Sequence, residues 1–212
     1  MGGTVHSLRQ GEWSWLTDPD REIADGVRLA RCAAALGKDD PTALLLSGMS
    51  LADLAGELET GAAHIERALT LNPNSAASWR ASGWVRIYLG EPTDAIERFA
   101  RAMRLSPLDP FAYIAYAGMG WAHLLAGRSD EAASWATKAC QEQPNAASPW
   151  RLAAIAYALS DRMVAAREAM ARLREIYPTL RLGNLTRAAP PFRRPEDLAR
   201  FTEGLRKAGL PE

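Results

Sequence analysis

Apolar residues recur three and four positions apart across residues 74–107, and this spacing predicts two amphipathic helices joined by a short turn. Gly90 suits the left-handed conformation just past the end of the first helix. Pro92 suits the first turn of the second helix, where its missing N–H leaves no bond unmade, and Pro107 ends that helix. A single hairpin of this kind cannot bury its apolar faces, so the prediction depends on whether the hairpin recurs.

The hairpin recurs, because prolines that end equivalent helices return at near-constant intervals. These prolines are 34, 37 and 34 residues apart, at Pro73, Pro107, Pro144 and Pro178. A small residue lies twelve positions before each of the last three, at Ala95, Ala132 and Ala166. An aromatic residue lies twenty-eight positions before them, at Trp79, Tyr116 and Trp150. The three extra residues of the third unit fall in a double-proline corner, residues 106–110.

These landmarks give the pattern W-x3-G followed by A-x3-F-x2-A-x4-P, which resembles the tetratricopeptide repeat. The resemblance implies an all-α fold in which helical hairpins stack into a right-handed superhelix. Four repeats are predicted, over residues 41–74, 75–107, 111–144 and 145–178. Residues 1–40 are interpreted as a degenerate N-terminal repeat. Residues 179–212 are interpreted as an irregular, proline-containing segment followed by a capping helix that Pro195 opens and Gly209 ends. The predicted apolar stripe of that helix is Leu198, Phe201 and Leu205.

Residues four apart on the first helix of each hairpin share one face, and in the family that the repeats resemble this face lines a concave groove. The predicted partner-binding residues of the groove are Met49, Arg80, Trp84, Tyr88, Trp121, Leu125, Arg151 and Ile155. Large apolar side chains with arginines at the edges are typical of protein-binding hot spots. A protein or peptide is therefore the expected partner.

Two other interpretations of these residues stay open. The tryptophans can instead be packed inside the superhelix, because tryptophan is usually mostly buried. Alternatively, the chain's own Pro190-Pro191-Phe192 segment lies in the groove. Binding of chaperone tails is not favoured, because the related carboxylate-reading repeats use lysines and asparagines on this face, where the chain offers two arginines and no asparagine.

The sequence contains no recognisable catalytic, cofactor or metal motif, so a non-catalytic protein without cofactor or metal is expected. The three histidines are His6, His64 and His123. None has a second ligand at the spacing that metal sites require. Cys32 and Cys140 fall among alanines, where packing is expected rather than reactivity.

Three acids near the N-terminus, Asp18, Asp20 and Asp25, invite a calcium interpretation. Pro19 interrupts them, and the glutamate that closes a calcium loop is missing. Capping of the following helix by Asp20 is the simpler explanation.

Composition narrows the class of partner. The chain has 25 basic and 25 acidic residues, so no overall charge attracts nucleic acid, and no nucleic-acid partner is expected. A locally basic C-terminus, which includes Arg193, Arg194, Arg206 and Lys207, is interpreted as solvated surface rather than as a site for an acidic partner. No apolar run is long enough for membrane insertion. Two distant cysteines and the lack of a signal-peptide pattern make the cytoplasm the expected location.

Residues 71–110 and 190–212 are similar to the C-terminal repeat region of bacterial class III adenylate/guanylate cyclase-like proteins. The resemblance implies a regulatory protein-interaction module that forms the C-terminal part of a larger bacterial signalling protein, with the cyclase domain N-terminal to it. An apolar N-terminal helix without a polar cap agrees with such a fragment. The alternatives are a homo-oligomerisation module and the sensory part of a transcriptional regulator, since related regions also follow DNA-binding domains.

Overall fold

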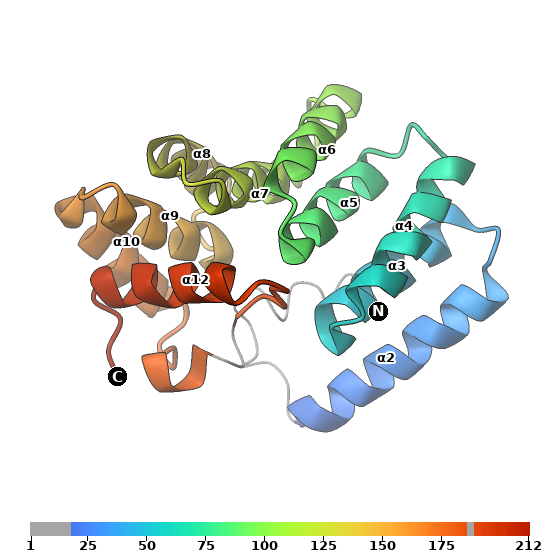
Figure 1. Ribbon diagram of the computed structural model, residues 1–212, viewed down its shortest axis with the longest axis horizontal. Coiled ribbons are helices and arrows are strands. Elements are labelled where there is room, and N and C mark those ends of the chain that lie inside the picture. Colours follow the sequence, from blue (N-terminus) through green and yellow to red (C-terminus); the bar gives the residue numbers. More distant parts are fainter. Residues whose placement is uncertain (1–17, 186–188) are drawn as a thin grey trace.

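The computed structural model describes residues 18–185 and 189–212, and the regular elements of these residues are helical (Figure 1). The first helix of the described residues is α2 (Pro19–Leu36). Four antiparallel pairs follow: α3 (Pro41–Ala55) with α4 (Leu58–Leu71), α5 (Ala76–Leu89) with α6 (Pro92–Leu105), α7 (Ala112–Leu125) with α8 (Ser129–Glu142), and α9 (Ala147–Leu159) with α10 (Met163–Ile176). A short 3₁₀ turn, η2 (Leu182–Asn184), precedes the last helix, α12 (Pro195–Lys207). The predicted all-α superhelix of stacked hairpins is confirmed.

The hairpins are arranged along an arc, and α12 lies on its inner side (Figure 1). Each helix packs on its partner in the hairpin and on the next hairpin, as a repeat array requires. The first helices of the four hairpins, α3, α5, α7 and α9, also contact one another in succession and form the inner row. In α12, Phe201 and Leu205 are buried as predicted. Leu198 is 38% exposed, so its placement in the apolar stripe is wrong.

Each hairpin turns at one residue in the left-handed conformation. The four residues and their φ angles are Gly56 (68°), Gly90 (78°), Gly127 (81°) and Asp161 (58°). The prediction for Gly90 is confirmed. The fourth corner uses an aspartate where the other three use glycine, although side chains disfavour this conformation.

Glycines in the inner row let an aromatic ring pack between two hairpins. The ring of Phe99 on α6 is fully buried. A Cβ atom added at Gly83 would lie 2.8 Å from this ring, and one added at Gly118 would lie 2.2 Å from it. Both distances are too short for a real contact, so the packing of α5, α6 and α7 requires glycine at these two positions.

The repeat also appears in individual hydrogen bonds. Trp79 Nε1 donates to the Pro73 carbonyl oxygen over 2.8 Å, and Trp150 Nε1 donates to the Pro144 carbonyl oxygen over the same distance. Each indole therefore fixes the turn that enters its hairpin. The residue that replaces tryptophan in the third unit, Tyr116, packs its ring on that of Trp135.

Residues 1–17 lie outside the described residues, so the interpretation of residues 1–40 as a degenerate repeat stays a prediction. The described part is α2, which packs on α3. Its N-cap is Asp18, whose side chain accepts from the Arg21 N–H. The prediction that Asp20 caps this helix is wrong, because Pro19 takes the first helical position and moves the cap one residue before it.

Candidate functional site

The predicted groove residues lie on the inner row of helices, and most of them are buried. The buried ones are Met49, Trp84, Tyr88, Trp121, Leu125, Arg151 and Ile155. They are therefore not open to solvent in this structure. Their role in partner binding stays a prediction, and the structure gives the reason for their burial.

The C-terminal segment, residues 189–212, covers the inner row. The Trp121 indole stacks on the ring of Phe201, with centroids 5.9 Å apart, and lies 6.0 Å from the ring of Phe192. A Cβ atom added at Gly204 of α12 would lie 2.4 Å from the Ile155 side chain. Of the interpretations left open by the sequence, the structure thus supports occupation of the groove by the chain itself.

A small cavity remains beneath this cover. It is lined by Asp53, Trp84, Tyr88, Trp121, Ser148, Arg151 and Pro190. The cavity has room for about one water molecule. Four predicted groove residues from three hairpins therefore meet around this cavity, and Pro190 of the C-terminal segment also lines it.

The cavity walls carry buried polar groups. Tyr88 Oη donates to Asp53 Oδ1 over 3.2 Å. Burial lowers the pKa of the Arg151 guanidinium to about 10, and nearby Tyr177, Tyr88 and Asp53 oppose that shift. The guanidinium also lies 5.8 Å from the centre of the Phe201 ring, within range of a cation–π contact.

Trp84 Nε1 is buried and has no hydrogen-bond partner among the described residues. Its ring packs against Tyr88 and, edge to face, against Phe99. The Trp84 ring thus packs between two other rings, and Trp84 also lines the cavity.

Cations of the C-terminal segment meet the corners at which the inner helices end. Arg194 lies directly on the end of α5, since a Cβ atom at Gly90 would be 2.3 Å from Arg194 Nε. Arg200 Nη1 donates to the Leu124 carbonyl oxygen over 2.7 Å, at the end of α7. Lys207 Nζ donates to Asp161 Oδ1 over 2.6 Å, just past the end of α9. Cations are favoured there because the last carbonyls of a helix carry partial negative charge.

The spacing of these cations matches the spacing of the hairpins. Arg194, Arg200 and Lys207 are six and seven residues apart. A helix rises about 1.5 Å per residue, so six or seven residues span roughly 9–10 Å. Packed helices lie about 8–10 Å apart. Each step along α12 therefore reaches the next corner. Lys207 is exposed, as the interpretation of solvated surface expects, whereas Arg194 is partly buried and also pairs with Asp197.

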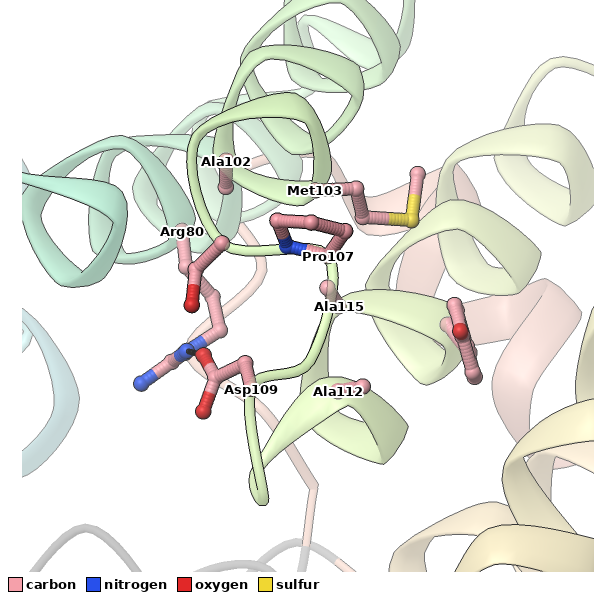
Figure 2. A pocket seen from close by; sticks show the side chains of 9 residues that line it. Arg80, Ala102, Met103, Pro107, Asp109, Ala112 and Ala115 are labelled. Carbon is pink, nitrogen blue, oxygen red and sulfur yellow. Dashed lines mark hydrogen bonds and ion pairs between the residues drawn. The ribbon is translucent and has the colours of Figure 1, made fainter.

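Arg80 lies apart from the other predicted groove residues. Its guanidinium pairs with the carboxylate of Asp109 in the double-proline corner between α6 and α7 (Figure 2). Both side chains are largely shielded from solvent. Arg80 thus fixes this corner, with its charge already paired within the chain.

Sequence reasoning missed Asp53 and Arg200. Asp53 lies four residues after Met49 on α3, and it precedes Tyr88 by the same 35 residues that separate Gly48 from Gly83. Extending the predicted line by one turn would therefore have found it. Arg200 had no such signal, because its partners are carbonyl groups some 75 residues earlier in the chain.

The histidines and cysteines of the described residues lie in different environments. Among residues 18–185 and 189–212, no group of three or more histidine, cysteine or acidic side chains could hold a metal ion. His123 Nδ1 accepts from Arg128 Nε over 2.9 Å, and burial together with Arg128 lowers the His123 pKa. Cys140 is buried, and burial raises its pKa to about 12, whereas Cys32 is exposed. His6 lies outside the described residues.

Comparison with known proteins agrees with this geometry. Residues 80–147 match the family model of the tetratricopeptide repeat. No curated protein matches the chain. The fold is therefore a superhelix of stacked helical hairpins similar to that of tetratricopeptide-repeat proteins. In the described residues, no helix is both long and apolar enough to cross a membrane.

Several solved structures share the fold at low sequence identity. PilW, a widely conserved type IV pilus biogenesis factor, is 17% identical, with a TM-score of 0.66 over 98% of this chain and 88% of its own. YrrB, a TPR protein with an unusual peptide-binding site, is 18% identical, with a TM-score of 0.53 over 84% of this chain and 90% of its own. The 41-end form of MamA from Desulfovibrio magneticus RS-1 is 19% identical, with a TM-score of 0.57 over 77% of this chain and 88% of its own.

Proposed function

We propose that the chain is a non-catalytic protein-interaction module that binds a protein or peptide along the inner row of its helices. The observation that carries this proposal is the way in which the inner row holds residues 189–212. An aromatic ring of this segment stacks on Trp121 of the inner row, and a cation of the segment donates to a carbonyl group at the end of an inner helix. A surface that packs one segment with these chemistries has the composition of a protein-binding site. The similarity to YrrB, a TPR protein with an unusual peptide-binding site, supports the same function.

The finer role follows the sequence resemblance. The module acts as a regulatory part of a larger bacterial signalling protein, such as a cyclase-like protein, by recruiting a partner or arranging subunits. This part of the proposal rests on residues 71–110 and 190–212 and on no structural observation. Oligomerisation through the apolar stripe of the last helix is not favoured, because Phe201 is already buried within its own chain.

The test is a binding measurement with a charge reversal at the edge of the groove. The full chain is immobilised, a protein retained from an extract of its source cells is identified, and that protein is then titrated in pure form. Glu59 is exposed and pairs with Arg193 of the covering segment. We expect Glu59→Lys to change the partner's affinity by more than about tenfold.

The matched control is Glu175→Lys, which reverses an exposed charge on α10, away from the inner row. We expect this control to bind as the native chain does. Equal affinity of both variants would place the partner elsewhere on the molecule. Turnover of a nucleotide by the purified chain would contradict the non-catalytic proposal.

A further inference from the structure

The C-terminal segment has two parts that differ in burial. Phe201 and Leu205 of α12 are fully buried, so α12 is part of the core. The strip that precedes it, residues 190–194, is less buried. Within this strip Phe192 is half-buried, and the Arg193 side chain is 44% exposed. The strip can therefore leave its place at a lower cost than α12.

The strip contacts the inner row as a short bound peptide would. The Arg193 N–H donates to the Tyr88 carbonyl oxygen over 2.8 Å, and its guanidinium pairs with Glu59. Phe192 packs on Trp121, and Pro190 lines the small cavity. Domains that bind extended peptides use main-chain hydrogen bonds for affinity and side-chain contacts for specificity.

The charges around the strip favour a basic ligand. Arg193 faces Glu59 at the α3–α4 corner. Arg194 lies on Gly90 at the end of α5, where partial negative charge gathers, and pairs with Asp197. Asp53 lies in the cavity wall beneath Pro190. Arg151 also lines this cavity, and both the Asp53 carboxylate and the ring of Phe201 lie close to its guanidinium.

We propose that residues 190–194 are the resident occupant of a peptide subsite. A partner segment of the same chemistry, with prolines followed by an aromatic residue and arginine, replaces them while α12 stays docked. The inference rests on the proposed function, because it names the partner chemistry and the regulation of that same groove. The strip acts as an internal competitor, and it weakens the apparent affinity for a partner by the fraction of time for which the subsite is free.

The test is a titration of the full chain with a labelled hexapeptide, Ala-Pro-Pro-Phe-Arg-Arg, which copies residues 189–194. Phe192→Ala removes the resident ring from Trp121, and Arg193→Glu turns the pair with Glu59 into a repulsion. We expect each variant to bind the peptide at least about tenfold more tightly than the native chain. The arginine variant lies at the surface, so it serves where the loss of Phe192 unfolds the chain.

The matched controls are Leu198→Ala and Arg206→Glu, which change exposed residues of α12 outside the strip. They are expected to bind the peptide as the native chain does. A hexapeptide with alanine in place of phenylalanine is expected to lose the gain. Equal affinity of the native chain and both strip variants, with unchanged melting temperatures, would overturn the proposal, as would full binding of the alanine peptide.

The same titration with the partner protein separates the two proposals. Tighter peptide binding by the strip variants, without any competition between peptide and partner, would contradict the proposed function and leave the subsite standing. If Glu59→Lys changes partner binding but the strip variants do not, the partner binds along the inner row without replacing residues 190–194. That result would support the proposed function and contradict this further inference.

Discussion

The ring of Phe201 stacks on the indole of Trp121 at 5.9 Å and 29°, and both side chains are fully buried. The two residues are 80 positions apart, and they join the last helix to the third hairpin. In an ordinary repeat array each unit contacts only its neighbours, so parts of the array can unfold separately. Here α12 adds contacts with α7 and α9, and we expect the third and fourth hairpins to unfold together.

Removing the Phe201 ring should test this coupling. Phe201→Ala leaves a cavity beside Trp121, and we expect it to lower the free energy of unfolding by about 3–5 kcal/mol. Urea denaturation followed by circular dichroism measures the change. Leu198→Ala on the same helix is the control, with an expected loss below about 1 kcal/mol. A loss of similar size in both variants would contradict the central position of the Trp121–Phe201 contact.

The close approach around Phe99 gives a second prediction. Gly118→Ala places a methyl group 2.2 Å from the Phe99 ring, so α6 and α7 have to move apart. We expect a loss of about 1–3 kcal/mol in the free energy of unfolding, although alanine normally favours a helix over glycine. Gly183→Ala is the control, because among the described residues only the glycine and its chain neighbours can lie within 4 Å of the added carbon. Thermal denaturation of both variants would show whether α6 and α7 adjust without cost.

Thiol reactivity should separate the two cysteines. Cys32 is exposed, whereas burial raises the Cys140 pKa to about 12. The thiolate is the reactive form, so at pH 8 we expect an aromatic disulfide reagent to modify Cys32 within minutes and Cys140 only after unfolding. Mass spectrometry of peptides from the modified chain identifies the site. Rapid native modification of Cys140, with Cys32→Ser as the control chain, would show that α8 opens readily.

Acid should loosen the end of α12. The hydrogen bond from Lys207 lowers the pKa of Asp161. The pairing therefore contributes to stability at pH values above the ordinary pKa of an aspartate. That contribution is lost as the pH falls through the lowered pKa. We expect amide exchange near residue 207 to accelerate in this acid range, after correction for the intrinsic exchange rate. The Lys207→Gln variant should lose this dependence, whereas Lys38→Gln should keep it.

Arg200 offers a test of the contacts between cations and helix ends. Its side chain donates to two carbonyl groups of α7. We expect Arg200→Ala to lower the free energy of unfolding by about 1–2 kcal/mol, since hydrogen bonds from charged groups to buried acceptors are comparatively strong. Arg206→Ala, which removes an exposed arginine six residues later, should change it by less than about 0.5 kcal/mol. Equal losses of unfolding free energy in the two variants, measured by urea denaturation, would show that Arg200 contributes through its charge alone and not through its hydrogen bonds.

The hairpin fold could be predicted because its signals are local. Gly90 in the left-handed corner and the tryptophan-to-proline spacing of Trp79 and Pro73 repeat within one unit, so arithmetic on the sequence finds them. The inner face could be predicted for the same reason. Trp84, Tyr88, Trp121 and Arg151 do meet around one cavity.

The cover of that face could not be predicted from periodicity. Phe192 and Phe201 reach Trp121 across more than seventy residues, and no repeat relates them to it. Arg80 had the right spacing for a groove residue, yet it pairs with Asp109 in the double-proline corner, where the regular period is broken by three residues. These contacts involve segments that occur once in the chain, so no repeated spacing in the sequence indicates them.

Because residues 190–194 belong to the same polypeptide as the groove, their local concentration does not fall on dilution. Tethered ligands typically behave as though present at roughly millimolar concentration. A micromolar partner therefore has to bind about a thousandfold better than the strip does in order to fill half of the sites. A dilute partner whose affinity only equals that of the strip therefore stays unbound. Binding requires either a partner sequence with higher affinity for the groove or a high local concentration of partner copies.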